Sequence, residues 1–411
     1  MMIRHVMKIC WNERKKNAFL LTELCIVAIA LWYVTDYLFI MNASYHVPLN
    51  RDIKDTYNVI ITQREKDSKG YIPEERLTQT KGEDILEIAN RLRLHPAVEN
   101  ASVSLVAQPY ITHDSYTVLH RDTLSRHLRC YMVDWEFFDV FRIRAKNGSP
   151  FLLEDLLPEQ LVLTADVEKD LFEGLSAVGK QIRWGEEESM RNICAVSGTM
   201  PQAEFMTPLP AFFYIMSDKG VVEMAENNWE VIEMSVRLKP DADEDAFRKE
   251  MMNGLNVQNF YLVDIQPIGD MRTSFLEHTV EQVKNRIYIL LFLVLNAFLA
   301  VIGVFWFRTS RRTNEIGLRK AVGFTCKDIR HILFSEGIVL LILAMVPAMI
   351  IGVALGRFNV LSTYFMPFTL KRFAIVTALC FLSLYLIVLA GIYFPARRAS
   401  KIHPVEALRE E

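Results

Sequence analysis

The chain has 411 residues, of which 51% are hydrophobic, and a formal net charge of −3. This length could hold two or three ordinary soluble domains, but the hydrophobic share is too high for such a protein. The composition therefore excludes an ordinary soluble enzyme and favours an integral membrane protein.

Four windows are long and apolar enough to cross a membrane. Each has 21 to 25 residues and contains no Lys or Arg, and about 20 apolar residues suffice to span a hydrocarbon core. A buried helix of a soluble protein would explain one such window but not four. The first window is too long for a signal-peptide core and no A-x-A site follows it, which indicates a retained anchor. The predicted spans are residues 18–40, 287–307, 332–356 and 373–394.

The short segments outside the windows differ in their content of Lys and Arg, which predicts the orientation. Sixteen of these residues lie in segments 1–17, 308–331 and 395–411, against three in segment 357–372. Both termini are therefore predicted to be cytoplasmic, with segment 41–286 outside the cytoplasm. Because topology accounts for the basic residues, we expect no nucleic-acid partner.

The outer segment 41–286 is acidic, with 40 Asp and Glu against 27 Lys and Arg. Such a surface keeps a domain soluble and away from an anionic membrane. Its two cysteines, Cys130 and Cys194, could pair in an oxidising compartment or remain thiols, and we favour two thiols. No Cys or His spacing typical of a metal site occurs, so no metal is expected.

Two strand–helix–strand units bracket the outer segment, and they predict one split βαβ, porter-like subdomain of α+β class. The stretch between them, Thr123–Asn228, is predicted to form a second, mainly β lobe. The expected elements are Tyr57–Gln63, Glu83–Leu94 and Val98–Tyr110 in the first unit, and Val231–Leu238, Asp241–Leu255 and Val257–Gln266 in the second.

A polar, helical stretch that contains no Pro or Gly, Asp270–Arg286, leads into the second span. As a continuous helix it would form a stalk of about 25 Å. A stiff stalk transmits displacement, whereas a flexible linker does not. Glu277, His278 and Val280 are the candidate stalk residues.

One stretch resembles a nucleotide-binding loop: Gly174 to Gln181 matches G-x-x-x-x-G-K-[ST] except at its last position. Gln181 cannot replace the hydroxyl that binds Mg²⁺, and strands rather than a helix are expected to follow. We interpret the stretch as a turn. No other catalytic motif is present, so neither catalysis nor a bound cofactor is predicted.

The segment 308–331 is charged, yet it also contains Ile316, Leu318 and Val322, so it can lie along the membrane and present a face to a partner. Glu315 to Gly323 (EIGLRKAVG) and Pro395 to Arg409 (PARRASKIHPVEALR) resemble the signature motifs of MacB/FtsX-type ABC transporter permeases. Glu336 stands where that family carries a glutamate early in its third span, and Leu171 to Ile182 is similar to its "LFG…GK.I" turn.

The resemblance implies a dimer of permeases, in which ATP is bound by a partner ABC ATPase subunit and stalks carry the motion outward. Because seventeen residues precede the first window, we expect that ATPase to be a separate polypeptide. Further implied partners are membrane lipid, a periplasmic adaptor and an outer-membrane channel. The residues expected to receive the ATPase are Glu315, Ile316, Gly317, Arg319, Lys320, Gly323, Arg397, Arg398, Pro404 and Glu406.

The predicted function is efflux of a peptide or hydrophobic compound across the cell inner membrane. Lipoprotein release and regulation of wall hydrolases are alternatives within the same family. A membrane receptor or scaffold without transport is the alternative from another class, and the absence of a copurifying ATPase would distinguish it.

Overall fold

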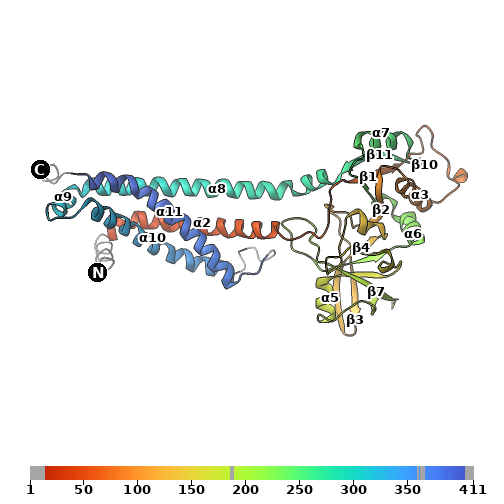
Figure 1. Cartoon of the computed structure of the whole chain (residues 1–411), viewed down its shortest axis with the longest axis horizontal. Helices are drawn as coiled ribbons and strands as arrows, with labels where there is room; N and C mark the ends of the chain where they lie inside the picture. The colour runs from red at the N-terminus through yellow and green to blue at the C-terminus, as the bar shows by residue number, and fades with distance from the viewer. Residues whose placement is uncertain (1–13, 186–188, 359–360, 362–365, 403–411) are drawn as a thin grey trace. The chain divides into compact units, whose positions relative to one another are not determined.

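The computed structural model describes residues 14–185, 189–358, 361 and 366–402. The chain divides into two compact units (Figure 1). The α/β unit comprises Tyr45–His278. The helical unit comprises Met1–Ser44 together with Thr279–Glu411.

The α/β unit is built on the predicted split βαβ arrangement. Its strands are ordered β11–β1–β9–β2 and each neighbouring pair is antiparallel. Thr80 and Glu83 form a capping box that begins the first helix, and Ile85, Ile88 and Leu92 of that helix are buried in the unit's core. The elements are β1 (Thr56–Gln63), α3 (Lys81–Arg93), β2 (Val98–Leu105), β9 (Ile232–Leu238), α7 (Glu244–Gly254), β10 (Asn256–Val257) and β11 (Phe260–Pro267).

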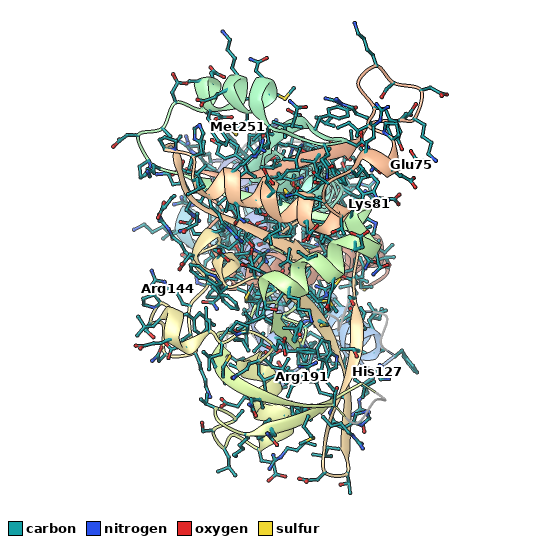
Figure 2. All side chains as sticks on the ribbon, turned by 90° about the vertical axis from the view of Figure 1, so that its right-hand side faces the viewer. Glu75, Lys81, His127, Arg144, Arg191 and Met251 are labelled. Carbon is teal, nitrogen blue, oxygen red and sulfur yellow. The ribbon has the colours of Figure 1, made fainter. Side chains whose placement is uncertain are left out.

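The predicted β lobe is a six-stranded closed ring. Its order is β4–β3–β6–β7–β5–β8, and β8 returns to pair with β4 in parallel. Leu119, Leu161 and Phe212 are fully buried inside it. Figure 2 shows His127 on β4 in this part of the unit and Met251 on α7 at the opposite end. The elements are β3 (Tyr116–Arg121), β4 (Leu124–Val133), α4 (Glu136–Val140), β5 (Leu161–Thr164), α5 (Ala165–Phe172), β6 (Gln181–Trp184), β7 (Ser189–Ser197) and β8 (Ala211–Ile215).

The predicted limits of the β lobe, Thr123–Asn228, were wrong at both ends. The first strand of the ring begins at Tyr116, and α6 (Asp218–Asn228) packs on α3 of the split βαβ part instead. The close approach depends on Gly82, because a Cβ there would lie 2.1 Å from the carbonyl oxygen of Val222.

Both cysteines of the α/β unit, Cys130 and Cys194, are free thiols, as favoured from the sequence. Cys130 is buried inside the ring, on β4. Cys194 lies on β7, where its Sγ donates to the carbonyl oxygen of Leu161 at 3.3 Å.

The helical unit has four helices that are long and apolar enough to span a membrane among the described residues. The stalk and the second span form one uninterrupted helix, α8, as the sequence predicted, and its 44 residues correspond to about 66 Å. The elements are α2 (Arg14–Tyr45), α8 (Ile268–Arg311), α9 (Thr313–Ala321), α10 (Cys326–Arg357) and α11 (Leu370–Ser400).

Several predicted limits differ from the structure because apolar windows mark only the membrane-crossing part of a helix. Helix α2 runs from Arg14 to Tyr45 rather than over residues 18–40, and α8 ends at Arg311 rather than at residue 307. Helix α10 begins at Cys326 rather than at residue 332. Helix α11 begins at Leu370 and includes Arg372, so the predicted loop 357–372 is wrong at its end. The same helix continues through Pro395 to Ser400, so the predicted tail is helical at its start.

A buried ion pair joins the first and last spans. Arg372 donates from Nε to Asp36 Oδ1 at 2.9 Å and from Nη2 to Asp36 Oδ2 at 2.6 Å, and each residue is 1% exposed. Its Nη1 also donates to the carbonyl oxygen of Met366 at 2.6 Å. Two charges that would be costly in hydrocarbon therefore satisfy each other.

A second buried charge cluster joins the two parts of the α/β unit. Arg93 on α3 donates to Asp134, which follows β4, at 2.8 Å, and lies 3.1 Å from a carboxylate oxygen of Glu136. Asp134 also accepts from the Ser102 hydroxyl and the Val103 N–H. Two carboxylates thus share one guanidinium.

This cluster predicts a pH dependence of stability. Burial, helped by the neighbouring charge of Asp134 and opposed by Arg93, raises the pKa of Glu136 to about 8. The folded protein therefore retains a proton that the unfolded chain releases above about pH 4.5, so stability falls as pH rises from there to about 8.

We expect Glu136→Gln to flatten this decline, because the amide does not titrate. The thermal midpoint of the α/β transition, measured in detergent between pH 5 and 8.5, checks it. Glu75→Gln, at an exposed carboxylate, is the matched control and should retain the wild-type slope. An unchanged slope in Glu136→Gln would mean that Glu136 does not hold the extra proton.

Candidate functional site

The segment between α8 and α10 is a short helix rather than a loop. Arg312 precedes α9, and the helix ends before Gly323, whose φ of +102° is accessible to glycine at little cost. Thr325 and Asp328 then form a capping box that begins α10. The segment therefore holds α9 rigidly between two spans.

A chain of charges connects α10 to the exposed side of α9. Arg312 Nη1 donates to both carboxylate oxygens of Glu336, at 3.0 and 3.2 Å, and Glu336 is 2% exposed. Arg312 Nε lies 3.7 Å from Glu315, which accepts from Arg319 at 2.5 Å. These four residues, with Ile316 and Leu333 among others, line a small pocket.

Sequence reasoning identified Glu336 but missed its partner. A carboxylate near the end of a span needs a cation, but seven basic residues of the segment 308–331 were equally available. Arg312 is the residue that reaches Glu336 because of the way α8 and α10 are positioned, which the sequence does not show.

Lys320 connects α9 to the end of α11. Its Nζ donates to the carbonyl oxygens of Ser400 and Ile402, at 3.0 and 2.8 Å. Cys326 Sγ donates to the same Ser400 carbonyl at 2.9 Å. A lysine at the carbonyl end of a helix satisfies acceptors that have no partner within that helix.

The residues predicted to receive the ATPase fall into two groups. Ile316 and Gly317 are buried, and Lys320 is partly buried against α11. Glu315, Gly323, Arg397 and Arg398 are exposed, and Arg319 is half-buried beside Glu315. Arg398 lies over the Trp306 ring at 4.5 Å. Pro404 and Glu406 lie outside the described residues.

Three large apolar side chains are exposed beside these charges. Leu318 is 57%, Val322 75% and Phe324 42% exposed. Val322 caps the end of α9 four residues after Leu318, so the two lie on the same side of the helix. We call Glu315, Leu318, Arg319, Val322 and Phe324 the α9 face. Phe324 was not identified from the sequence. It follows the glycine that ends the helix, so it is not part of the helical spacing of apolar residues.

The candidate stalk residues lie in α8, with Glu277 and His278 exposed and Val280 half-buried. Nearer the start of this helix, Arg272 Nε donates to Glu204 at 2.6 Å, and Glu204 also accepts from the Tyr110 hydroxyl at 3.2 Å. The sequence gave no signal for this contact, because Glu204 lies in a segment without regular pattern. The first turns of α8 are thereby fixed to the α/β unit.

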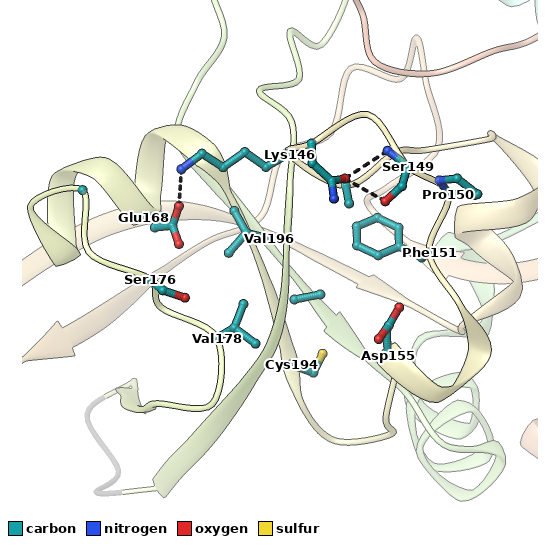
Figure 3. A pocket seen from close by; sticks show the side chains of 14 residues that line it. Lys146, Ser149, Pro150, Phe151, Asp155, Glu168, Ser176, Val178, Cys194 and Val196 are labelled. Carbon is teal, nitrogen blue, oxygen red and sulfur yellow. Dashed lines mark hydrogen bonds and ion pairs between the residues drawn. The ribbon is translucent and has the colours of Figure 1, made fainter.

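A cavity of about 680 Å³ opens beside β7 in the β lobe (Figure 3). Gly174, Ser176 and Val178 of the false nucleotide-binding loop line it. Its cation, Lys146, is already paired with Glu168 at 2.6 Å. The predicted strand β6 follows at Gln181, and Lys180 lies over the Phe172 ring, an arrangement unlike a phosphate-binding helix start.

Two family models match the chain. Residues 25–253 match the MacB-like periplasmic core domain, and residues 287–404 match the FtsX-like permease C-terminal domain. Together they cover most of the α/β unit and the last three spans.

Several curated proteins are similar. Over 342 residues the chain is 24% identical to the macrolide export ATP-binding/permease protein MacB of Acinetobacter baylyi, which covers 80% of this chain and 50% of that protein. It is also 24% identical over 342 residues to the uncharacterized ABC transporter permease YvrN of Bacillus subtilis, with 79% of each chain covered. The chain spans about half the length, or less, of the curated MacB proteins that it matches.

Two solved structures are also similar. The periplasmic region of MacB from Actinobacillus actinomycetemcomitans is 13% identical, covers 56% of this chain and 94% of that one, and gives a TM-score of 0.33. The extracellular domain of the noncanonic ABC-type transporter YknZ from Gram-positive bacteria is 13% identical, covers 51% and 100%, and gives 0.32. On the two family matches, the chain belongs to the MacB/FtsX-type ABC transporter permeases.

Proposed function

We propose that this chain is the membrane subunit of a MacB-like ABC transporter. A dimer of such subunits couples ATP hydrolysis by a separate ATPase to motion of the α/β domains, for efflux of a peptide or hydrophobic compound. The excess of Lys and Arg in segments 1–17, 308–331 and 395–411 supports an inner-membrane orientation with both termini and α9 in the cytoplasm.

The α9 face is the observation that carries this proposal. It combines exposed apolar side chains with charges of both signs, which is the composition of a protein-docking surface rather than of a solvated loop. With α9 in the cytoplasm, this face is available to a soluble ATPase. The protein's own contribution is to bind and move, and no catalytic step is assigned to it.

The contacts behind the α9 face provide the route for movement. Arg312 and Glu336 connect α9 to α10, and Lys320 connects it to α11. A displacement of α9 by the docked ATPase would therefore be shared by two spans. Helix α8 has a continuous hydrogen-bonded backbone from the α9 end to Ile268, where the strand β11 ends.

Reversing the charges of the α9 face should abolish ATPase binding. The double variant Glu315→Lys with Arg319→Glu retains an i,i+4 ion pair on α9, so α9 remains helical while the partner meets inverted charges. The measurement is copurification of the ATPase with the tagged permease from membranes.

A second double variant, Leu318→Ser with Val322→Ser, should weaken the same binding by removing exposed apolar contact without disturbing the core. The control is Lys219→Glu with Glu223→Lys, which reverses an exposed i,i+4 pair on α6 and should copurify the ATPase normally. Undiminished binding by both α9 variants would refute docking at this face, and no copurifying ATPase in the wild type would favour a receptor.

Interrupting the stalk should uncouple hydrolysis from motion. Replacing Glu277 and His278 by Gly-Pro removes about 4 kcal/mol of local helix stability and creates a hinge in α8. We expect ATPase activity of the assembled complex to persist, because α9 is unchanged. Nucleotide-dependent changes in hydrogen exchange of the α/β unit should disappear.

The matched control replaces the same two residues by Ala-Ala, which preserves the helix and should preserve the nucleotide-dependent exchange. If the Gly-Pro variant still shows the wild-type exchange changes, α8 does not carry the motion.

A further inference from the structure

The ends of α8 and α11 that adjoin α9 carry three arginines without an acidic partner among the described residues. Arg311 lies in the last turn of α8, Arg397 and Arg398 lie in the last turn of α11, and all three are exposed. The neighbouring Arg312 and Arg319, by contrast, are both held by glutamates. The orientation rule explains why basic residues lie on this side of the membrane, but not why these three lack the partners that their neighbours have.

Aromatic side chains are exposed directly beside these arginines. The Arg398 guanidinium lies 4.5 Å from the centre of the Trp306 ring, so an arginine of α11 packs on a side chain of α8. Arg311 lies 4.2 Å over the Phe307 ring of its own helix. Trp306, Phe307 and Phe394 are 44%, 56% and 65% exposed. Exposed rings at the end of a span are typical of the boundary between hydrocarbon and headgroups, and here they hold two guanidinium groups at that boundary.

The positions along the helices place the arginines at the depth of lipid headgroups. The apolar windows of α8 and α11 end at residues 307 and 394. The three arginines follow by three or four residues, which corresponds to about 4.5–6 Å of helix. The headgroup layer outside the hydrocarbon core is about 5–7 Å thick on each side of a bilayer. The guanidinium groups therefore lie at the level of the lipid phosphates.

We propose that Arg311, Arg397 and Arg398, with the Trp306 and Phe394 rings, bind the headgroup of an anionic phospholipid. Guanidinium donors match the geometry of phosphate oxygens, and the exposed rings contact the acyl chains below. The cytoplasmic leaflet carries anionic lipids, and their headgroups supply the negative charge that no described residue supplies. Arg397 and Arg398 are thereby assigned to the membrane rather than to the ATPase. The lipid site rests on the orientation proposed above, and not on docking at the α9 face.

The test uses the full-length protein in phosphatidylcholine vesicles that contain phosphatidylglycerol, with bromine on the acyl chains of one lipid or the other. Bromine quenches nearby tryptophans, and the contribution of Trp306 is the difference from Trp306→Phe, which keeps an aromatic ring beside Arg398. The two quenching curves give the relative binding constant of the lipids at this site. An anionic lipid surface strengthens binding up to about fivefold for each nearby arginine, so phosphatidylglycerol should be preferred by about tenfold or more.

Arg397→Gln with Arg398→Gln should reduce this preference by about fivefold or more. The matched control, Lys66→Gln with Lys69→Gln, removes two exposed charges from the α/β unit and should keep the wild-type preference. If the arginine variant is not inserted, Arg311→Gln replaces it and should reduce the preference up to about fivefold. Equal binding of the two lipids by the wild type, or an unreduced preference in the arginine variant, would overturn the proposal.

Copurification of the ATPase separates the lipid site from the docking surface. Arg397→Gln with Arg398→Gln should copurify the ATPase as the wild type does. Glu315→Lys with Arg319→Glu should lose the ATPase but keep the lipid preference, which is measured without any ATPase present. An arginine variant that loses the ATPase and keeps the lipid preference would return both arginines to the docking surface.

Discussion

Charges placed where water is scarce must find partners within the chain, and this constraint organises the helical unit. Asp36 with Arg372 joins the first and last of the long helices, and Glu336 with Arg312 joins α10 to the junction of α8 and α9. Removing one member of such a pair leaves a buried charge, which costs about 3–5 kcal/mol. The pairs therefore fix which helices are neighbours, while the apolar residues between them supply contact area without specifying a partner.

The two pairs differ in what they hold. The carboxylate of Asp36 meets a guanidinium that also donates to the Met366 carbonyl, so the pair closes the start of α11 against α2. The Arg312 guanidinium instead lies between the buried Glu336 and the exposed Glu315, so it connects the interior to a residue of the α9 face. A force applied to that face therefore reaches α10 through the Arg312–Glu336 ion pair, which is costly to break because Glu336 is buried.

Elements set by local pattern were predictable, and those set by distant contacts were not. The helical spacing of Glu83–Leu94 and the polar stretch Asp270–Arg286 without helix breakers predicted α3 and the start of α8. Arg372 was misplaced in a loop, because its pairing with Asp36 depends on residues more than 300 positions away. The contact between Glu204 and Arg272 could not be predicted either, because no sequence pattern relates the two residues. Which side of α9 is buried and which is exposed depends on the position of α10, which the sequence does not give.

The strand β1 has a further consequence, for how the α/β unit is made. Tyr57 pairs with Pro267 on one side and with Val236 on the other. At synthesis rates of about 5–20 residues per second, roughly 10–40 s pass between the emergence of β1 and that of β11. During that interval β1 is an apolar strand with both edges open, attached to a span that has already entered the membrane. The ring of the β lobe can close before the sheet of the split subdomain has formed. The inserted lobe is then folded while the second half of the split subdomain has yet to be synthesised.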